Sequence, residues 1–409
     1  MRPPQITRHA SGLWLLIACL SLGAPSTAFA QHEPAATSGS AGGAAQPAPP
    51  SKPSLEVYGF AMLDIGQNFT TINPNWFDTM RVTRLPSFED QFGRDGSTFA
   101  GVRQTRFGVR STTPTDLGDL KTTFRLRHAY GELGHFGAGQ TWSPFMDIDV
   151  FPNSLEYWGP TGMVFFRNVQ VRWMPIQGDT RLTLALERPG ASGDAGVLAD
   201  RIELQNVRGR SPAPDLSGEY RFGRPWGYVE AAGMLGWMKW DDILDDQFDL
   251  SGSATRWGIN LSSNLKFGGS NTLRLQFVFG EGIQNYMNDS PVDVGIARNP
   301  GDIRSPIKGE AIPITASVVF LDHNWNKQWS TSVGYSRQDN DNTDGQADDA
   351  FETGQYALGN LLYSPVANVM MGGEVQWGRR EMFRDPFVGK GFKLQFSFKY
   401  NFSATIGGQ

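Results

Sequence analysis

Residues 392–402 read Phe-Lys-Leu-Gln-Phe-Ser-Phe-Lys-Tyr-Asn-Phe, with a large apolar side chain at every even position and a polar one at every odd position. Because successive side chains of a strand point to opposite faces, this stretch predicts a strand with one apolar and one polar face. Alternation over about ten residues that ends on an aromatic is typical of a membrane-spanning barrel strand whose apolar face meets lipid. A strand of a soluble sandwich is the alternative, and it requires a second sheet over the apolar face.

The same alternation recurs along the chain, which favours the barrel. The other candidate strands occupy residues 55–65, 99–110, 121–133, 136–142, 165–173, 181–187, 216–222, 228–240, 257–267, 273–279, 312–320, 329–337, 356–363 and 369–380. Short connectors such as 268–271 and 364–365 alternate with long ones such as 284–309 and 338–353. Short periplasmic turns opposite long external loops are typical of bacterial outer-membrane barrels.

Strand number sets a second expectation. The candidates number about fifteen, whereas single-chain bacterial barrels normally have an even number of strands. One further strand is therefore expected, within residues 121–133 or within residues 78–85. Taken as a single strand, residues 121–133 place Phe124, Leu126 and Tyr130 on one face and Lys121, Arg125 and Arg127 on the other.

Bulk properties exclude several classes of protein. The chain has 409 residues and a net charge of -5, with a pI of about 5.6 and a mean hydropathy of -0.35. Beyond the N-terminus no apolar run reaches the roughly 18 residues of a transmembrane helix, which excludes a helical membrane protein. A barrel stays possible because alternation dilutes its hydrophobicity. The acidic balance gives no support to a nucleic-acid partner.

The N-terminus predicts export. Arg2 and Arg8 precede an apolar core at residues 13–20, and Ala28-Phe29-Ala30 offers a cleavage site, so residues 1–30 are expected to be a signal peptide. A lipoprotein box ending at Cys19 is the alternative. Cleavage after Ala30 removes Cys19, the single cysteine, and leaves no disulfide or thiol chemistry. Residues 31–53, rich in Ala, Gly, Ser and Pro, predict a disordered periplasmic tether. The barrel domain is expected over residues 54–402, followed by a C-terminal tail at 403–409.

Charged residues on the polar faces suggest a function. If those faces line a lumen, fixed guanidinium groups lower the barrier to anions, and the predicted pore-lining basic wall comprises Arg106, Arg110, Arg125, Arg127 and Arg172. The long segment after residue 142 is predicted to be a constriction loop that carries Asp147, Asp149 and Glu156. These acids and Glu132 also offer the arginines ion-pair partners that would hold the loop. Both readings are compatible, because an acidic loop against a basic wall creates a transverse field.

Motifs for enzymes, cofactors and metals are weak. Residues 339–345 resemble a calcium loop, but Phe351 stands where the loop needs Glu, so a solvated external loop is the favoured reading. No nucleophile elbow, zinc-helix motif or phosphate loop occurs, and neither an enzyme nor a cofactor is expected. A barrel hydrolase with His128 or His323 as base, and a structural or adhesin-type barrel, stay open as alternatives.

Several ordered blocks resemble the DcaP-like outer-membrane porin family. They occupy residues 103–109, 125–132, 139–147, 157–162, 280–283, 363–365 and 378–381. The resemblance implies a sixteen-stranded homotrimeric barrel in a Gram-negative outer membrane, surrounded by lipid and lipopolysaccharide. It also implies passive conduction of small, often anionic solutes such as dicarboxylates.

The chain departs from the family pattern in three places. The hairpin before the Arg-Leu-Arg-His-Ala-Tyr block at residues 125–130 is truncated. The tether lacks a coiled-coil pattern, and seven residues follow the expected terminal aromatic, Phe402.

Overall fold

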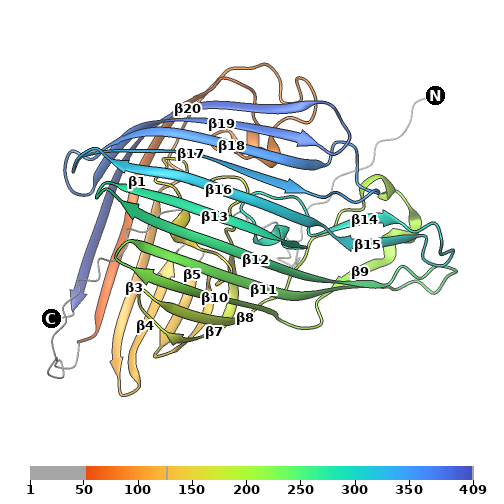
Figure 1. Cartoon of the computed structure of the whole chain (residues 1–409), viewed down its shortest axis with the longest axis horizontal. Helices are drawn as coiled ribbons and strands as arrows, with labels where there is room; N and C mark the ends of the chain where they lie inside the picture. Colours follow the sequence, from red (N-terminus) through yellow and green to blue (C-terminus); the bar gives the residue numbers. More distant parts are fainter. Residues whose placement is uncertain (1–51, 126–127, 408–409) are drawn as a thin grey trace, which may run out of the picture.

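The computed structural model describes residues 52–125 and 128–407 (Figure 1). Its strands are β1 (Ser54–Asn68), β2 (Ser97–Gly101), β3 (Arg106–Thr115), β4 (Gly118–Arg125), β5 (His128–Leu133), β6 (Phe136–Trp142), β7 (Arg167–Ile176), β8 (Arg181–Glu187), β9 (Val207–Arg210), β10 (Asp215–Arg224), β11 (Gly227–Asp242), β12 (Gly252–Phe267), β13 (Asn271–Glu281), β14 (Val294–Arg298), β15 (Ile307–Ala311), β16 (Pro313–Asn324), β17 (Trp329–Asn340), β18 (Phe351–Tyr363), β19 (Val369–Met382) and β20 (Val388–Gly407). Short 3-10 helices are η1 (Pro74–Trp76), η2 (Val82–Arg84), η3 (Ile148–Val150), η4 (Gly196–Leu198), η5 (Ile202–Asn206) and η6 (Gln284–Tyr286). None of the helices in these ranges is long and apolar enough to cross a membrane.

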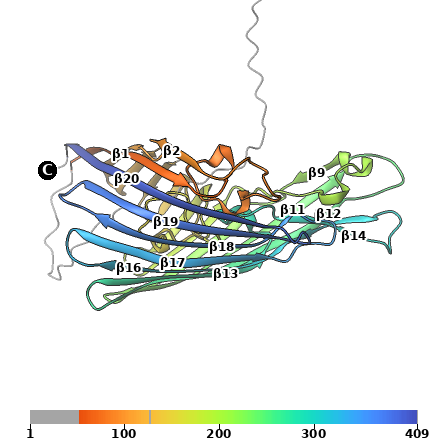
Figure 2. The same cartoon turned by 90° about the horizontal axis from the view of Figure 1, so that it is seen from above.

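The strands close into one antiparallel barrel of 16 strands, in which β20 pairs with β1. Strands β2 and β3 pair with successive parts of β1, so they form one barrel strand with a break between them. Strands β9 and β10 share the partner β11 in the same way. The β14–β15 hairpin lies outside this sheet and projects beyond the barrel at the end opposite the last residues of β20 (Figures 1 and 2).

The sixteenth strand lies within residues 121–133, the first of the two places where it was expected. Residues 121–133 contain parts of both β4 and β5, which pair with each other, while residues 78–85 form loop and η2. The prediction of a single strand was wrong, and it placed Tyr130 on the wrong face of the sheet. Thr123 pairs with Tyr130 and Phe124 with Ala129, and paired residues share a face. Tyr130 therefore lies on the lumen side with Arg125; Leu126 and Arg127 lie outside the described residues.

The alternation of the last strand is confirmed as a division between two faces. Phe396, Phe398 and Tyr400 are exposed on the outside of the barrel, whereas Lys393 and Gln395 are buried inside it. The predicted C-terminal tail is corrected. Strand β20 continues to Gly407 and pairs with the start of β1, since nothing in this stretch interrupts the hydrogen-bonded ladder.

The wall is much lower on one side than on the other. Strands β3 to β8 have 6 to 10 residues each, whereas β11 and β12 have 16 each and β20 has 20. Figure 1 shows the short strands β3, β4 and β5 together on one side of the barrel. The truncated hairpin noted in the sequence is thus part of a low wall.

The interior of the barrel is filled on its other side by inward-folded loops. The loop between β1 and β2, residues 69–96, packs Met80, Val82 and Leu85 against other buried apolar residues. The loop between β6 and β7, residues 143–166, contributes Phe145, Phe165 and their neighbours to the same cluster. These two loops therefore occupy part of the barrel interior.

Candidate functional site

The loop at residues 143–166, called the constriction loop below, is attached to the barrel wall along its length. At its start, Ser143 Oγ donates to Glu187 on β8 (2.6 Å). In the middle, Asn264 on β12 donates to the backbone carbonyl of Asp149 (2.6 Å). Further along, Asn360 on β18 donates to the carbonyl of Asn153 (2.7 Å). These bonds from separate strands fix the loop across the lumen.

Asp147 is an anchor of this loop and is fully buried. Its carboxylate forms an ion pair with Arg221 on β10 (2.6 Å). The same carboxylate accepts hydrogen bonds from Tyr228 on β11 and Ser262 on β12, each at 2.6 Å. Three strands therefore converge on one side chain, and Asp147 is not presented to the lumen.

Asp149 is the acidic residue of the loop that faces the open space. Its carboxylate also contacts Arg221, but its side chain is 42% exposed. Asp149 lines a cavity of 740 Å³ together with Ile148 and Phe151 of the same loop. Of the three acids predicted in the constriction loop, Asp149 is the one that both contacts the barrel wall, at Arg221, and is accessible from the cavity.

Glu156 is buried and anchors the far end of the loop. Its carboxylate pairs with Lys393 on β20 (3.0 Å) and accepts from the backbone N–H of Met80 (3.0 Å). Burial raises the pKa of Glu156 above its ordinary value, and the nearby Lys393 opposes that rise. The backbone N–H groups of Leu155 and Glu156 donate to Glu374 on β19. Glu156 borders the 740 Å³ cavity but serves mainly as an attachment.

The wall opposite the loop is basic. Arg106 and Arg110 from β3, Arg125 from β4 and Lys399 from β20 line the 740 Å³ cavity, and we call these four residues the basic wall. Arg110 also pairs with Glu56 (3.1 Å) and lies over the ring of Tyr58. The structure thus brings three of the five predicted arginines to the same cavity, facing Asp149.

The remaining predicted arginines are not placed there. Arg172 does not line the cavity; its guanidinium donates to the carbonyl of Trp142 and to Gln170, and lies 5.1 Å from the ring centroid of Tyr130. Arg127 lies outside the described residues. Sequence reasoning missed Lys399 as a pore residue, although it occupies the polar face of the last strand. Arg167 does not line this cavity; it donates to His128 (2.9 Å) and lies over the ring of Trp142.

On the opposite wall, β8 and β10 carry arginines whose charges are balanced by acids of β10 and β11. Arg181 pairs with Glu219 and Glu230, and Arg221 pairs with Glu230 as well as with the loop acids. The first part of the constriction loop is attached to this wall through Ser143 and Asp147. The basic side chains that line the 740 Å³ cavity, by contrast, come from β3, β4 and β20.

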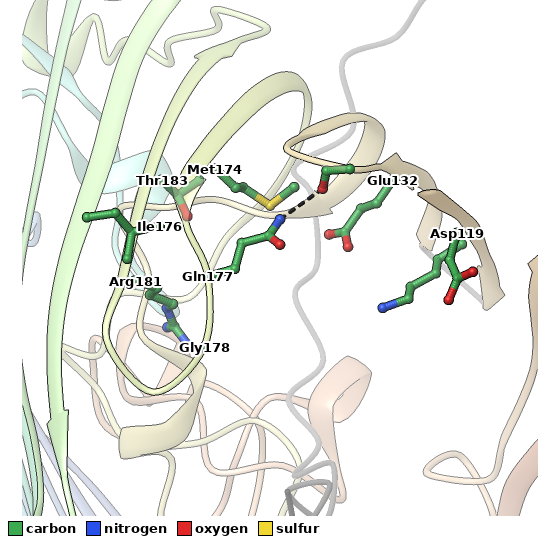
Figure 3. A pocket seen from close by; sticks show the side chains of 10 residues that line it. Asp119, Glu132, Met174, Ile176, Gln177, Gly178, Arg181 and Thr183 are labelled. Carbon is green, nitrogen blue, oxygen red and sulfur yellow. Dashed lines mark hydrogen bonds between the residues drawn. The ribbon is translucent and has the colours of Figure 1, made fainter. Parts of the chain in front are cut away.

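A second cavity of 480 Å³ lies near the short turns, between β4–β5 and β7–β8 (Figure 3). Charged side chains of both signs line it, including Asp119, Lys121, Glu132 and Arg181. Gln177 spans part of it and donates to the carbonyl of Gly134 (2.9 Å). This space is a mixed-charge vestibule, in contrast to the basic wall.

A comparison with protein-family models shows to which family the chain belongs. The family model described as "DcaP outer membrane protein" matches residues 114–402. The chain belongs to this family. The match confirms the resemblance drawn from the sequence blocks and places the chain among outer-membrane proteins. A search of curated proteins found no match.

Solved structures support the fold. The DcaP outer-membrane channel of Acinetobacter baumannii is 20% identical with a TM-score of 0.68, and the alignment covers 86% of this chain and 98% of that one. An anion-selective porin from Comamonas acidovorans is 10% identical, with a TM-score of 0.55 and coverage of 86% and 100%. OmpT of Vibrio cholerae in a trimer form is 13% identical, with a TM-score of 0.51 and coverage of 86% and 100%. At these identities the likeness establishes the barrel architecture.

Proposed function

We propose that this member of the DcaP family is an outer-membrane porin that conducts small hydrophilic anions, dicarboxylates among them, by passive diffusion. The observation that carries the proposal is the basic wall opposite the constriction loop, around the 740 Å³ cavity. Arg106, Arg125 and Lys399 present positive charge where the inward loops leave space. Fixed cations at a narrow point lower the barrier for anions and raise it for cations.

Conductance in a planar bilayer tests the proposal against its rivals. A porin gives discrete open-channel steps, whereas a structural or adhesin-type barrel and a closed hydrolase barrel give none. The histidines considered for a hydrolase have structural contacts: His128 approaches Thr141 and Arg167, and His323 approaches Asn271. Uptake by proteoliposomes of a panel of dicarboxylates, monocarboxylates and neutral sugars then defines the solute class. Faster uptake of sugars than of acids of similar size would contradict the proposal.

We further propose that the protein forms a homotrimer through the low wall of β3 to β8. The outward side chains Phe107, Phe124, Phe136 and Trp173 are exposed there, on strands too short for a full-height membrane wall. A second copy covering this face would remove the mismatch between these strands and the bilayer. One neighbour of similar fold was solved as a trimer. The taller walls of β11 to β20 would then face lipid, with lipopolysaccharide at the outer rim.

A further inference from the structure

One arginine of the loop at residues 69–96 joins three separate loops inside the barrel. The guanidinium of Arg81 donates from both Nε (3.0 Å) and Nη2 (2.8 Å) to Oδ1 of Asp289, which lies in the connection between β13 and β14. The same guanidinium lies 4.3 Å from the ring centroid of Trp76, in its own loop, and 4.2 Å from that of Trp158, in the constriction loop. We call Arg81, Asp289, Trp76 and Trp158 the arginine clamp.

The clamp is largely shielded from water. The side chains of Arg81 and Asp289 are 12% and 1% exposed. Asp289 is also bonded by the backbone N–H and the hydroxyl of Thr83 (2.9 and 2.6 Å). Because the buried carboxylate of Asp289 accepts all these hydrogen bonds, it holds Arg81 strongly. Loss of Arg81 would leave the charge of Asp289 buried and uncompensated. The planar guanidinium is suited to the site, because it donates two N–H groups to Asp289 and contacts ring faces at the same time.

The loop that carries Arg81 is seated on a surface of lumen-facing glycines. A Cβ atom added at Gly391 would lie 2.5 Å from Met80 Sδ, and one at Gly378 would lie 3.0 Å from it. At Gly354 an added Cβ would lie 3.1 Å from Val82 Cγ1. The wall of β18 to β20 is therefore shaped to receive this loop.

The same loop positions the residues that border the passage. Met80, next to Arg81, donates its N–H to Glu156, and Thr79 donates its hydroxyl to Tyr157 (2.9 Å). Both Glu156 and Tyr157 line the 740 Å³ cavity, and Trp158 follows them directly. The arginine clamp thus acts on the lining of the cavity through adjacent residues on both loops.

We propose that Arg81 is a positioning residue that sets the upper size limit of the channel. By holding the inward loops together, its guanidinium keeps residues 155–158 against the basic wall and limits the cross-section of the passage. This role rests on the proposed porin function. It concerns solute size and not charge, because Arg81 does not line the cavity and its charge is neutralised by Asp289.

The test compares Arg81→Ala with the wild-type protein in proteoliposomes, using swelling rates in neutral oligosaccharides and polyethylene glycols of increasing size. The matched control is Arg84→Ala, which removes an exposed arginine three residues away, in η2. Arg81→Ala should raise the uptake of solutes near the wild-type cut-off by about twofold or more, since cross-section governs passage of uncharged solutes. Arg84→Ala should leave the cut-off unchanged. The sign of the reversal potential should be the same in all three proteins.

An unchanged cut-off in folded Arg81→Ala, or an equal change in Arg84→Ala, overturns the proposal. Heat-modifiable mobility in detergent gels establishes that each barrel is folded. If Arg81→Ala does not fold, Arg81→Lys decides, because it keeps the charge but loses the planar contacts. A cut-off equal to wild type in Arg81→Lys then overturns the proposal, and a larger cut-off supports it. Failure of the porin function is distinguishable, because the wild type itself would then admit none of the neutral solutes.

Discussion

At the scale of single residues, we propose that Arg106 and Arg125 give the channel a preference for anions. Both are held on lumen faces by strand alternation, and both line the cavity across from the constriction loop. Their charge acts over a screened distance of roughly 10 Å at 0.1 M salt. A solute that enters the cavity is within this range of the basic wall, so its own charge determines how easily it passes.

Reversal of one of these charges should change selectivity. Arg106→Glu and Arg125→Glu should each move the reversal potential in a salt gradient toward cations and slow dicarboxylate uptake, with smaller effects at higher ionic strength. The lysine variants should be nearly silent because they keep the charge. Arg172→Glu is the matched comparison: Arg172 does not line the cavity, so its effect should be smaller. Equal effects at Arg172 and Arg106 would show that the cavity does not control selectivity.

Two acids of the constriction loop should respond differently to substitution. Asp149→Asn removes a negative charge that faces the cavity, so anion preference should increase while the barrel keeps its stability. Asp147→Ala instead removes one of the two buried carboxylates that pair with Arg221, which keeps Glu230. It also removes the acceptor of Tyr228 and Ser262, so the loop should be held less tightly. Protease sensitivity and current noise should therefore increase for Asp147→Ala and not for Asp149→Asn. If the Asp147→Ala channel had the current noise and protease resistance of the wild type, Asp147 would not be an anchor of the loop.

At the scale of an element, the last strand, β20, closes the barrel by pairing with β1. Phe402 lies over Gly59 of β1, where an added Cβ would lie 2.8 Å from the Phe402 ring. Beyond Phe402, pairing with β1 continues until Ser54 meets Gly407. The closure of the barrel therefore extends past the terminal aromatic of the family pattern.

Both parts of this closure should matter for assembly. Phe402→Ala should reduce the yield of folded barrel, because the ring covers Gly59 at the outer face. Deleting residues 403–409 removes paired residues of β20 and should lower the temperature at which the barrel unfolds in a detergent gel. Ser403→Ala, which loses a single hydrogen bond to Glu56, serves as the control. An unaltered unfolding temperature after the deletion would show that this extension is dispensable.

Prediction from the sequence was accurate for strands and weak for loops. Alternation on residues 392–402 identifies the strand and its two faces, because the signal is local. No comparable signal in the sequence separates β4 from β5, so two short strands were merged and Tyr130 was assigned to the wrong face. The environment of Asp147 depends on Tyr228 and Ser262, which are 81 and 115 residues away. Long-range contacts of this kind leave no pattern in a single sequence.

For the whole molecule, the uneven height of the wall leads to a prediction about assembly. If the low wall is covered by a second copy, then a charged side chain on its outer face should disrupt the trimer. Trp173→Glu should shift the protein toward monomers in mild-detergent light scattering. Val333→Glu, on the tall wall of β17, should not do so, although it too replaces an exposed apolar residue. Trimers of unchanged stability in Trp173→Glu would exclude this face as the interface.

We propose that the basic wall, together with the constriction loop across the cavity from it, makes this DcaP-family barrel an anion channel. The most direct measurement is the reversal potential of the wild-type protein in a planar bilayer with a potassium chloride gradient. An anion channel should give a potential of the sign set by chloride, and its magnitude should fall as total salt rises because the charge of the basic wall is screened. A potential of the sign set by potassium, from channels with normal conductance steps, would contradict it.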